Sequence, residues 1–198
     1  ILEVNSSDGS FNLVSENTEN NYSFRSVFDI IMDNDDNIYM TGRYYDIWSG
    51  GNQEEEVAVR KYDTNYNIDW EFRLNGSNQD YGYSLAYDPI NNLIYTSGRA
   101  LGVDLNPLGE PYIPNYGDDR GDYFAAYNTD GILQFAHIFA GSSQNRAIDI
   151  SLNIMENRLL ISGRLKGYPD LDVTEGQFFP VENYPYQTSN TDFVSIYG

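Results

Sequence analysis

The sequence predicts an all-β protein built from one antiparallel unit that repeats along the chain. Runs of alternating apolar and polar residues recur between clusters of Asn, Asp, Gly and Pro, which is the pattern of strands joined by hairpin turns. Long helical patterns are absent. Three tripeptides each close such a run: Thr41-Gly42-Arg43, Ser97-Gly98-Arg99 and Ser162-Gly163-Arg164.

The middle copy shows the unit most completely, and the other copies fit its frame. In the middle copy we expect strands over residues 57–62, 68–74, 83–87 and 93–97. In the third copy we expect strands over residues 123–127, 132–139, 147–152 and 158–162. The first copy supplies strands over 10–14, 27–32 and 38–41. Asp130-Gly131 is the strongest of the turn signals between these strands.

The third strands of the copies share one packing pattern when they are superposed. One face is large and apolar, and it carries Phe28, Ile30 and Met32, then Tyr83, Leu85 and Tyr87, then Ile148, Ile150 and Leu152. The other face is mostly small or polar, and it carries Asp29 and Ile31, Ser84 and Ala86, Asp149 and Ser151. Because strand side chains alternate between faces, this pattern predicts a packing rule that repeats in every unit.

Four antiparallel strands per unit favour a β-propeller-type array of about three four-stranded blades. The approximate units are 1–50, 51–120 and 121–190, within one domain of residues 1–198. They exceed the ~40 to 50 residues of common blades. Two inserts, 101–120 and 166–190, account for the excess, and their Gly, Pro, Asn, Asp and Tyr content predicts long loops between blades.

Further features recur around the tripeptides. They are the strand Asp122 to Tyr127, the turn Thr129-Asp130-Gly131, the aromatic residues Trp70 and Phe135, the Gly-Ser pairs 76–77 and 141–142, and the hairpins ending at Gly42 and Gly98. This combination resembles the SBBP-type β-propeller repeat of secreted and cell-surface bacterial proteins. The middle copy departs from it by lacking Gly in its first turn. The resemblance implies a propeller in an extracellular or cell-surface location, and it implies no particular activity because propellers host many functions.

The ends of the chain predict a mode of assembly. Leu2-Glu3-Val4 aligns with the end of a first strand, and residues 191–197 form a complete first strand without a following hairpin. We expect this closing strand to complete an N-terminal blade, of the same chain or of a neighbouring one. The assembly residues would be Phe193, Val194, Ile196 and Tyr197. Head-to-tail pairing that does not close produces a filament, and a longer propeller that includes this chain is the alternative.

The amino-acid composition of the chain makes several classes of partner unfavourable. The net charge of −19, from 30 acidic and 11 basic side chains, makes nucleic acid and anionic membranes poor partners. No apolar run approaches the ~18 residues that span a membrane, so we expect no membrane insertion. The absence of Cys excludes disulfides and Cys-type zinc sites. Asn5, Asn21 and Asn75 begin Asn-x-Ser/Thr triplets at expected turns or loops and are candidate N-glycosylation sites.

No catalytic constellation is evident. His137 is the single histidine and is expected to be a packed or surface residue of a strand. Residues 33–37 have the look of a calcium loop, but Ile38 and Tyr44 stand where an EF-hand needs Gly and an acidic residue. We therefore expect an ordinary turn and no cofactor, with calcium of another geometry left open. Residues 54–56, all Glu, are expected to be a solvated cluster that protects an edge.

Two recurring residue types have alternative interpretations. Arg43, Arg99 and Arg164 occupy one blade position, where a structural ion pair is favoured over a groove that binds anions. Aromatic residues in or beside the inter-blade loops could stack on sugars, anchor a protein contact, or pack the loops onto the blades. These candidate recognition residues are Tyr44, Tyr45, Trp48, Tyr112, Tyr116, Tyr168, Tyr184 and Tyr186.

The leading hypothesis is a non-enzymatic secreted or cell-surface structural or interaction module. In its sharper form the protein is an extracellular filament subunit that assembles head to tail by strand complementation, with itself or other surface proteins as partners. The alternative is a lectin-like propeller that binds glycans through the aromatic loops. A hydrolase that uses clustered acids is a third interpretation.

Overall fold

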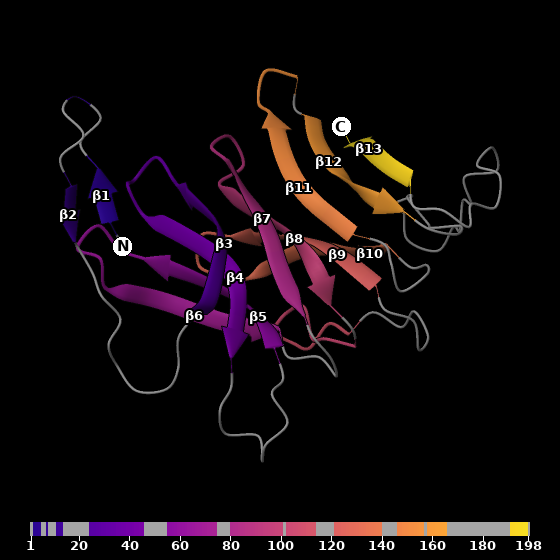
Figure 1. Cartoon of the computed structure of the whole chain (residues 1–198), viewed down its shortest axis with the longest axis horizontal. Helices are drawn as coiled ribbons and strands as arrows, with labels where there is room; N and C mark the ends of the chain where they lie inside the picture. The colour runs from indigo at the N-terminus through magenta and orange to yellow at the C-terminus, as the bar shows by residue number, and fades with distance from the viewer. Residues whose placement is uncertain are drawn as a thin grey trace, which may run out of the picture.

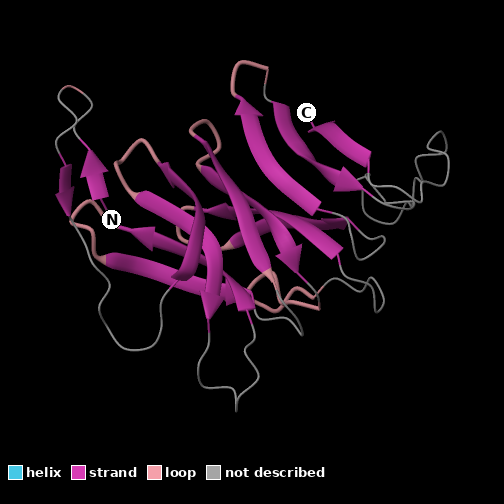
Figure 2. Cartoon of the chain, viewed as in Figure 1, coloured by secondary structure: helices cyan, strands magenta, loops and turns pink. Residues whose placement is uncertain are grey.

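The computed structural model describes residues 2–4, 7, 11–13, 24–45, 55–74, 80–100, 102–113, 121–139, 146–156, 158–165 and 191–197. Strands, turns and irregular segments make up these residues, and no helix occurs among them (Figure 2). The all-β class that the repeated alternation predicts is confirmed.

Three antiparallel sheets follow one another along the chain (Figure 1). The first sheet contains, in spatial order, β3 (Phe24–Met32), β4 (Ile38–Tyr45), β5 (Glu55–Tyr62) and β6 (Ile68–Leu74). The second sheet contains β7 (Tyr81–Asp88), β8 (Leu93–Ala100), β9 (Gly121–Asn128) and β10 (Leu133–Phe139). The third sheet contains β11 (Arg146–Asn153), β12 (Arg158–Leu165) and β13 (Thr191–Tyr197). A separate ribbon pairs β1 (Leu2–Val4) with β2 (Phe11–Leu13).

Each sheet starts one hairpin later than the corresponding unit predicted from the sequence. The strands expected to open the middle unit, β5 and β6, instead close the first sheet, because β5 continues the ladder of β4 from Ile38↔Tyr62 to Tyr45↔Glu55. The hydrogen-bonded sheets therefore cover residues 24–74, 81–139 and 146–197. A periodic sequence does not show at which strand a unit begins. Only the hydrogen-bonded pairing of the strands shows which strands form one sheet.

The C-terminal strand belongs to the third sheet, so the prediction that it completes the N-terminal blade of its own chain is wrong, and completion of a neighbouring chain's blade stays a prediction. The backbone of β13 pairs antiparallel with β12 from Leu159↔Tyr197 to Leu165↔Thr191. It takes third place in its sheet, as β5 and β9 do in theirs, and it lies at the sheet edge. The N-terminal strands β1 and β2 pair with each other.

The first strands of the three sheets lie side by side, with β7 between β3 and β11 (Figure 1). Alternate side chains of β9 show how the sheets stack. Tyr123, Ala125 and Tyr127 join the core against the first sheet, whereas Phe124 and Ala126 join the core against the third. The second sheet is therefore covered by apolar side chains on both of its faces.

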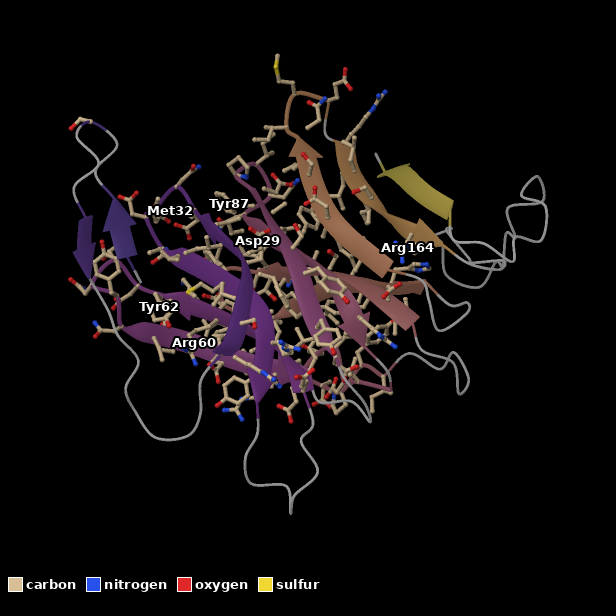
Figure 3. All side chains as sticks on the ribbon, in the orientation of Figure 1. Asp29, Met32, Arg60, Tyr62, Tyr87 and Arg164 are labelled. Carbon is tan, nitrogen blue, oxygen red and sulfur yellow. The ribbon has the colours of Figure 1, made fainter. Side chains whose placement is uncertain are left out.

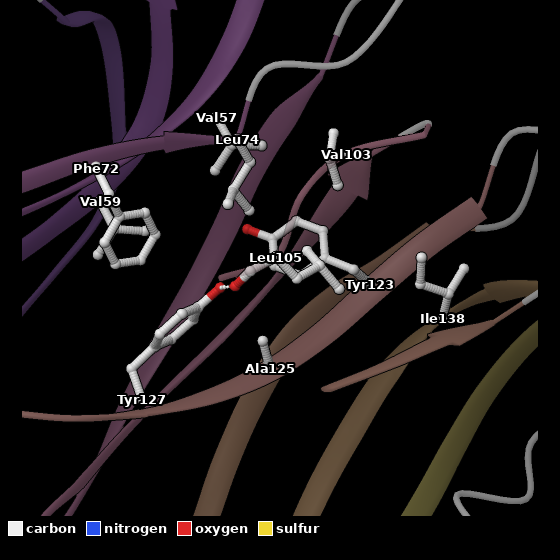
Figure 4. Close-up of a cluster of buried hydrophobic side chains, with 10 residues drawn as sticks. All are labelled: Val57, Val59, Phe72, Leu74, Val103, Leu105, Tyr123, Ala125, Tyr127 and Ile138. Atoms are coloured by element: carbon white, nitrogen blue, oxygen red, sulfur yellow. Dashed lines mark hydrogen bonds between the residues drawn. The ribbon is translucent and has the colours of Figure 1, made fainter. Parts of the chain in front are cut away.

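The insert that follows β8 is part of the core. Val103 and Leu105 are fully buried with residues of the first and second sheets (Figure 4). The Tyr127 hydroxyl donates a hydrogen bond to the carbonyl oxygen of Leu105 at 2.7 Å, and the Leu105 amide donates to the carbonyl oxygen of Tyr112 at 2.9 Å. Residues 102–113 are irregular, as a loop should be, but Val103 and Leu105 fill space between two sheets, while residues 108–113 are exposed.

A bulge recurs in the first strand of every sheet and explains the recurrent glycine. The register shifts fall between Val27 and Asp29, between Gly82 and Ser84, and between Ala147 and Asp149. Gly42, Gly98 and Gly163 pair with the residue just before each shift. A Cβ atom added to Gly42 or Gly98 would lie 2.1 Å from a backbone carbonyl oxygen of the bulged strand. Any larger residue would therefore push the two strands apart.

Candidate functional site

A row of polar side chains links the first strands of the three sheets. Asp29 of β3, Ser84 of β7 and Asp149 of β11 occupy equivalent positions just after the bulge. The Ser84 hydroxyl oxygen lies 3.0 Å from Asp29 Oδ2 and 3.1 Å from Asp149 Oδ1. The row therefore crosses all three sheets at the place where their first strands meet, and Figure 3 labels Asp29 there.

The same row ties the backbone of each first strand to the sheet before it. The Leu85 amide donates a hydrogen bond to Asp29 Oδ2 at 2.7 Å, and the Ile150 amide donates to Ser84 Oγ at 3.3 Å. The equivalent amide of the first sheet belongs to Ile30, and it donates to Asp29 Oδ1 of its own strand at 2.8 Å. In the second and third sheets, a side chain of the preceding sheet accepts the hydrogen bond of this amide. In the first sheet, a side chain of the same strand accepts it.

The contacts of this row suit a brace between sheets. The Ser84 hydroxyl has one proton to donate to its two carboxylate neighbours, and its oxygen accepts the Ile150 amide. No histidine or lysine is among its hydrogen-bond partners in the described part of the chain. His137 lies elsewhere, buried in β10 opposite Phe124, as a packed strand residue should be.

An open apolar face lies on the far side of β3 from this row. Phe28, Ile30 and Met32 are 47, 52 and 57% exposed. The residues equivalent to Ile30 in the other sheets, Leu85 and Ile150, are only 3 and 5% exposed. At this position, the face that the sequence predicts to be a packing surface is therefore buried in the second and third sheets and open in the first. Exposed apolar surface of this kind marks a site of interaction.

A second polar cluster surrounds Glu55 of β5, whose side chain is buried. Arg25 Nη1 lies 2.6 Å from one carboxylate oxygen, and Arg43 Nη1 lies 3.1 Å from the same oxygen. The Tyr81 hydroxyl donates to Glu55 Oε2 at 3.0 Å, and the Arg43 guanidinium lies 5.5 Å from the centre of the Tyr81 ring. Two cations compensate the burial of one carboxylate. Burial, together with the bond to Glu55, raises the pKa of Tyr81.

This cluster bears on two predictions from the sequence, one for the Glu residues 54–56 and one for the recurring Arg residues. Glu55 and Glu56 are buried, so the prediction of a solvated cluster is wrong for both, and Glu54 lies outside the described residues. Glu55 is the partner of Arg25 and Arg43. The prediction of a structural ion pair is confirmed for Arg43. Arg99 lies opposite Asp122 in the β8–β9 ladder, and Arg164 lies opposite Asp192 in the β12–β13 ladder.

The candidate calcium loop is a closed turn. Asp33 Oδ1 accepts the amides of Asp35 and Asn37 at 2.9 Å each, and Asp33 Oδ2 accepts the Asn37 side-chain amide and the Tyr39 hydroxyl at 2.9 Å each. Burial alone would raise the pKa of Asp33, but these hydrogen bonds hold it below the ordinary aspartate value. Both carboxylate oxygens are therefore engaged inside the hairpin that joins β3 to β4.

The same turn design recurs along the chain. Asp63 Oδ1 accepts the amides of Asn65 and Asn67 at 2.9 and 2.8 Å. Asn128 Oδ1 likewise accepts the amides of Asp130 and Ile132 at 3.1 and 2.9 Å. An amide oxygen thus serves as well as a carboxylate, which indicates a turn rather than a cation site. Within the described ranges, no group of three or more acidic or histidine side chains is placed to hold a metal ion.

The recognition residues predicted from the sequence differ in whether the structure buries them, exposes them or does not describe them. Tyr44 is not a surface residue: it is fully buried in β4, where its ring lies 6.4 Å from Phe24 and 4.0 Å from the Arg73 guanidinium carbon. Tyr45 ends β4, and Tyr112 is exposed in the insert after β8. The remaining candidates lie outside the described residues: Trp48, Tyr116, Tyr168, Tyr184 and Tyr186, together with the sequon residues Asn5, Asn21 and Asn75.

The predicted assembly residues lie in β13. Opposite them on β12, in backbone register, Phe193 pairs with Gly163, Val194 with Ser162, Ile196 with Leu160 and Tyr197 with Leu159. One edge of this strand is therefore occupied within the same chain. Its other edge is the edge of the third sheet.

No protein-family model matches the chain, and no curated protein matches its sequence. The segments that the structure describes contain no helix long and apolar enough to cross a membrane. The site must therefore be interpreted from its own geometry.

Sequence reasoning found the residues of the polar row but not their contacts. Asp29, Ser84 and Asp149 stand out as polar residues on one strand face, yet nothing in the pattern says that Asp29 receives an amide from the next sheet. The Glu55 cluster was missed because Arg25, Glu55 and Tyr81 are far apart in the sequence.

Proposed function

We propose that this chain is a non-enzymatic structural or interaction module of propeller type, built to associate with further sheets of its own design. The observation that carries the proposal is the repeated join between sheets. The same bulge, the same glycine and the same amide bond to the preceding sheet occur at both internal joins. A join that is repeated within a chain can be repeated between chains, as in other modular arrays.

Edge pairing is the first route to such association. The strand β13 is at the edge of a three-stranded sheet, whereas the first and second sheets each have four strands. A strand from a second copy, or from another surface protein, would add a fourth strand and bond to the free backbone groups of β13. This modifies the strand complementation expected from the sequence, since β13 now receives a strand instead of donating itself.

A secreted or cell-surface location fits this role. The resemblance to secreted bacterial repeats and the three sequons support it, and the net charge of −19 favours a soluble surface that avoids anionic partners. We propose that the protein uses neither metal nor cofactor for this role.

Electron microscopy of the purified chain tests the proposal, because fibres, rings and isolated particles look different. We expect assemblies larger than one chain, and we expect deletion of residues 191–198 to reduce them while circular dichroism of the remaining sheets stays similar. Isolated particles of the full chain at every concentration would contradict the proposal.

Glycan binding is the rival function. Tyr112 is a candidate recognition residue whose exposure supports it, and the burial of Tyr44 weakens it. A glycan array separates the two functions: specific binding that is lost in Tyr112→Ala, from a chain that remains a monomer, would favour the rival.

A further inference from the structure

The two internal joins obey one rule of face packing. At the join between the first and second sheets, Leu85 of β7 packs in a core with Ile31 of β3. At the join between the second and third sheets, Ile150 of β11 packs in a core with Ala86 of β7. In both joins the large apolar face of one first strand meets the small face of the first strand before it.

Both halves of this join also occur at surfaces that are partly exposed in the described structure. The large face of β3, formed by Phe28, Ile30 and Met32, is about half exposed at each residue, and the Phe28 ring also lies 6.1 Å from the Tyr83 ring of β7. On β11, the small-face residues Asp149 and Ser151 are exposed. The first sheet therefore presents one half of the join and the third sheet presents the other.

The hydrogen bonding supports the same pairing. Leu85 and Ile150 give their amides to the preceding sheet, whereas the Ile30 amide is held by the side chain of its own neighbour, Asp29. Asp149 is the residue equivalent to the acceptors Asp29 and Ser84, and its Oδ1 lies 3.1 Å from the Ser84 hydroxyl oxygen. By this equivalence we expect the Asp149 carboxylate to accept an amide of a following first strand.

We propose that a second copy of this chain docks the exposed side of its third sheet against β3. Phe28, Ile30 and Met32 of one copy pack over Ser151 of the other, and the Asp149 carboxylate of that copy accepts the Ile30 amide. The inference rests on the proposed function and specifies its partner and surface, which are separate from the edge of β13. Two copies together bring a number of sheets within the range of about four to eight that closed propellers have.

Complementary variants test this head-to-tail contact. Ile30→Asp damages only the β3 half of the join, and Ser151→Glu damages only the β11 half. Because both side chains are exposed, neither change should unfold the chain, and thermal unfolding followed by circular dichroism checks this. Sedimentation of each variant alone should show a dissociation constant raised at least about tenfold.

Mixing gives the decisive readout. An equimolar mixture of the two variants keeps one intact join, formed by the Ser151→Glu copy's β3 and the Ile30→Asp copy's β11, and should produce a dimer that grows no further, because the second join would bring two carboxylates together. Ile90→Asp is the matched control, because Ile90 is 65% exposed in the turn between β7 and β8 and lies outside the join. This control should assemble as the unchanged chain does.

The outcomes separate this inference from the proposed function. Assembly that survives Ile30→Asp and Ser151→Glu but is lost on deletion of 191–198 overturns the face contact and leaves edge pairing standing. A mixture of the two variants that stays monomeric also overturns the face contact. An unchanged chain that is monomeric at every concentration overturns both.

Discussion

Gly98 lies opposite the bulge of β7, where there is no room for a side chain. An added Cβ would lie 2.1 Å from the Tyr81 carbonyl oxygen and 2.6 Å from a ring carbon of Tyr123, which is fully buried. Neither atom can withdraw without moving a strand. We therefore expect Gly98→Ala to lower the free energy of unfolding by about 2 to 3 kcal/mol, measured by urea denaturation.

Ser97→Ala is the control for Gly98. Ser97 is buried beside it, and no hydrogen-bond partner for its hydroxyl is found among the described residues. Removing that hydroxyl adds no atom, so the free energy of unfolding should change by less than about 0.5 kcal/mol. Equal effects at both positions would show that the Gly98 change acts through something other than crowding.

The Tyr39 hydroxyl is one of the donors that lower the pKa of Asp33. Tyr39→Phe should therefore move the Asp33 pKa upward toward the ordinary aspartate value, as followed by NMR titration of the carboxyl carbon. Tyr87→Phe is the control, because the Tyr87 hydroxyl bonds to Asn92 in a different turn. An Asp33 pKa that does not respond to Tyr39→Phe would contradict the hydrogen bond.

The lowered pKa of Asp33 also makes stability depend on pH. A carboxyl group whose pKa is lower in the folded state contributes stability that is fully present above its unfolded value, here 3.8. The contribution is lost as the pH falls through the folded pKa. Tyr39→Phe narrows the gap between the two pKa values, so the variant should lose less stability than the unchanged chain on acidification from about pH 5 to about pH 2.

What the sequence could predict at the scale of single residues depends on whether a residue recurs. Gly42, Gly98 and Gly163 recur in one frame, so a shared backbone reason was foreseeable, and the structure supplies it as a bulge. Tyr44 and Glu55 do not recur, and their surroundings come from strands far away in the sequence. Their burial could not be predicted from local pattern, because side chains of β3 and β6 or β7 cover them.

Among the elements, the irregular segment 102–113 contributes buried side chains to the core between two sheets. Leu105 is fully buried with Val57, Tyr123 and Tyr127, whereas Leu108, three residues later, is 41% exposed. Leu105→Ala should lower the free energy of unfolding by about 2 to 5 kcal/mol, since the cavity cannot easily collapse between two sheets. Leu108→Ala should cost less than about 1 kcal/mol in the same denaturant titration. A small effect at Leu105 would mean that the segment lies on the surface after all.

The strands were easier to predict than the pairing between them. Alternation along one strand is a local property, so the strands over 57–62 and 68–74 were placed within a few residues of β5 and β6. The order of strands in a sheet depends on contacts between strands that are distant in the sequence. The predicted units are therefore shifted by one hairpin relative to the observed sheets. The burial of Val103 and Leu105 was missed because turn-forming residues around them dominate the segment.

At the scale of the whole molecule, charge opposes the association that the sheets favour. Each copy carries a net charge of −19 at pH 7, so two copies repel one another before their faces meet. The proposed contact itself is mostly apolar, with one carboxylate-to-amide bond and no ion pair. Added salt should therefore strengthen association rather than weaken it.

Sedimentation at two ionic strengths checks this expectation. Between about 10 mM and about 150 mM salt the Debye length falls from about 30 Å to about 8 Å, which screens the repulsion between copies. We expect the dissociation constant to fall over this interval for the unchanged chain and for Ile90→Asp alike. Association that weakens with salt would instead indicate ion pairs across the interface, and the basic residues Arg25 and Arg158, which are half exposed, would then be the first to replace.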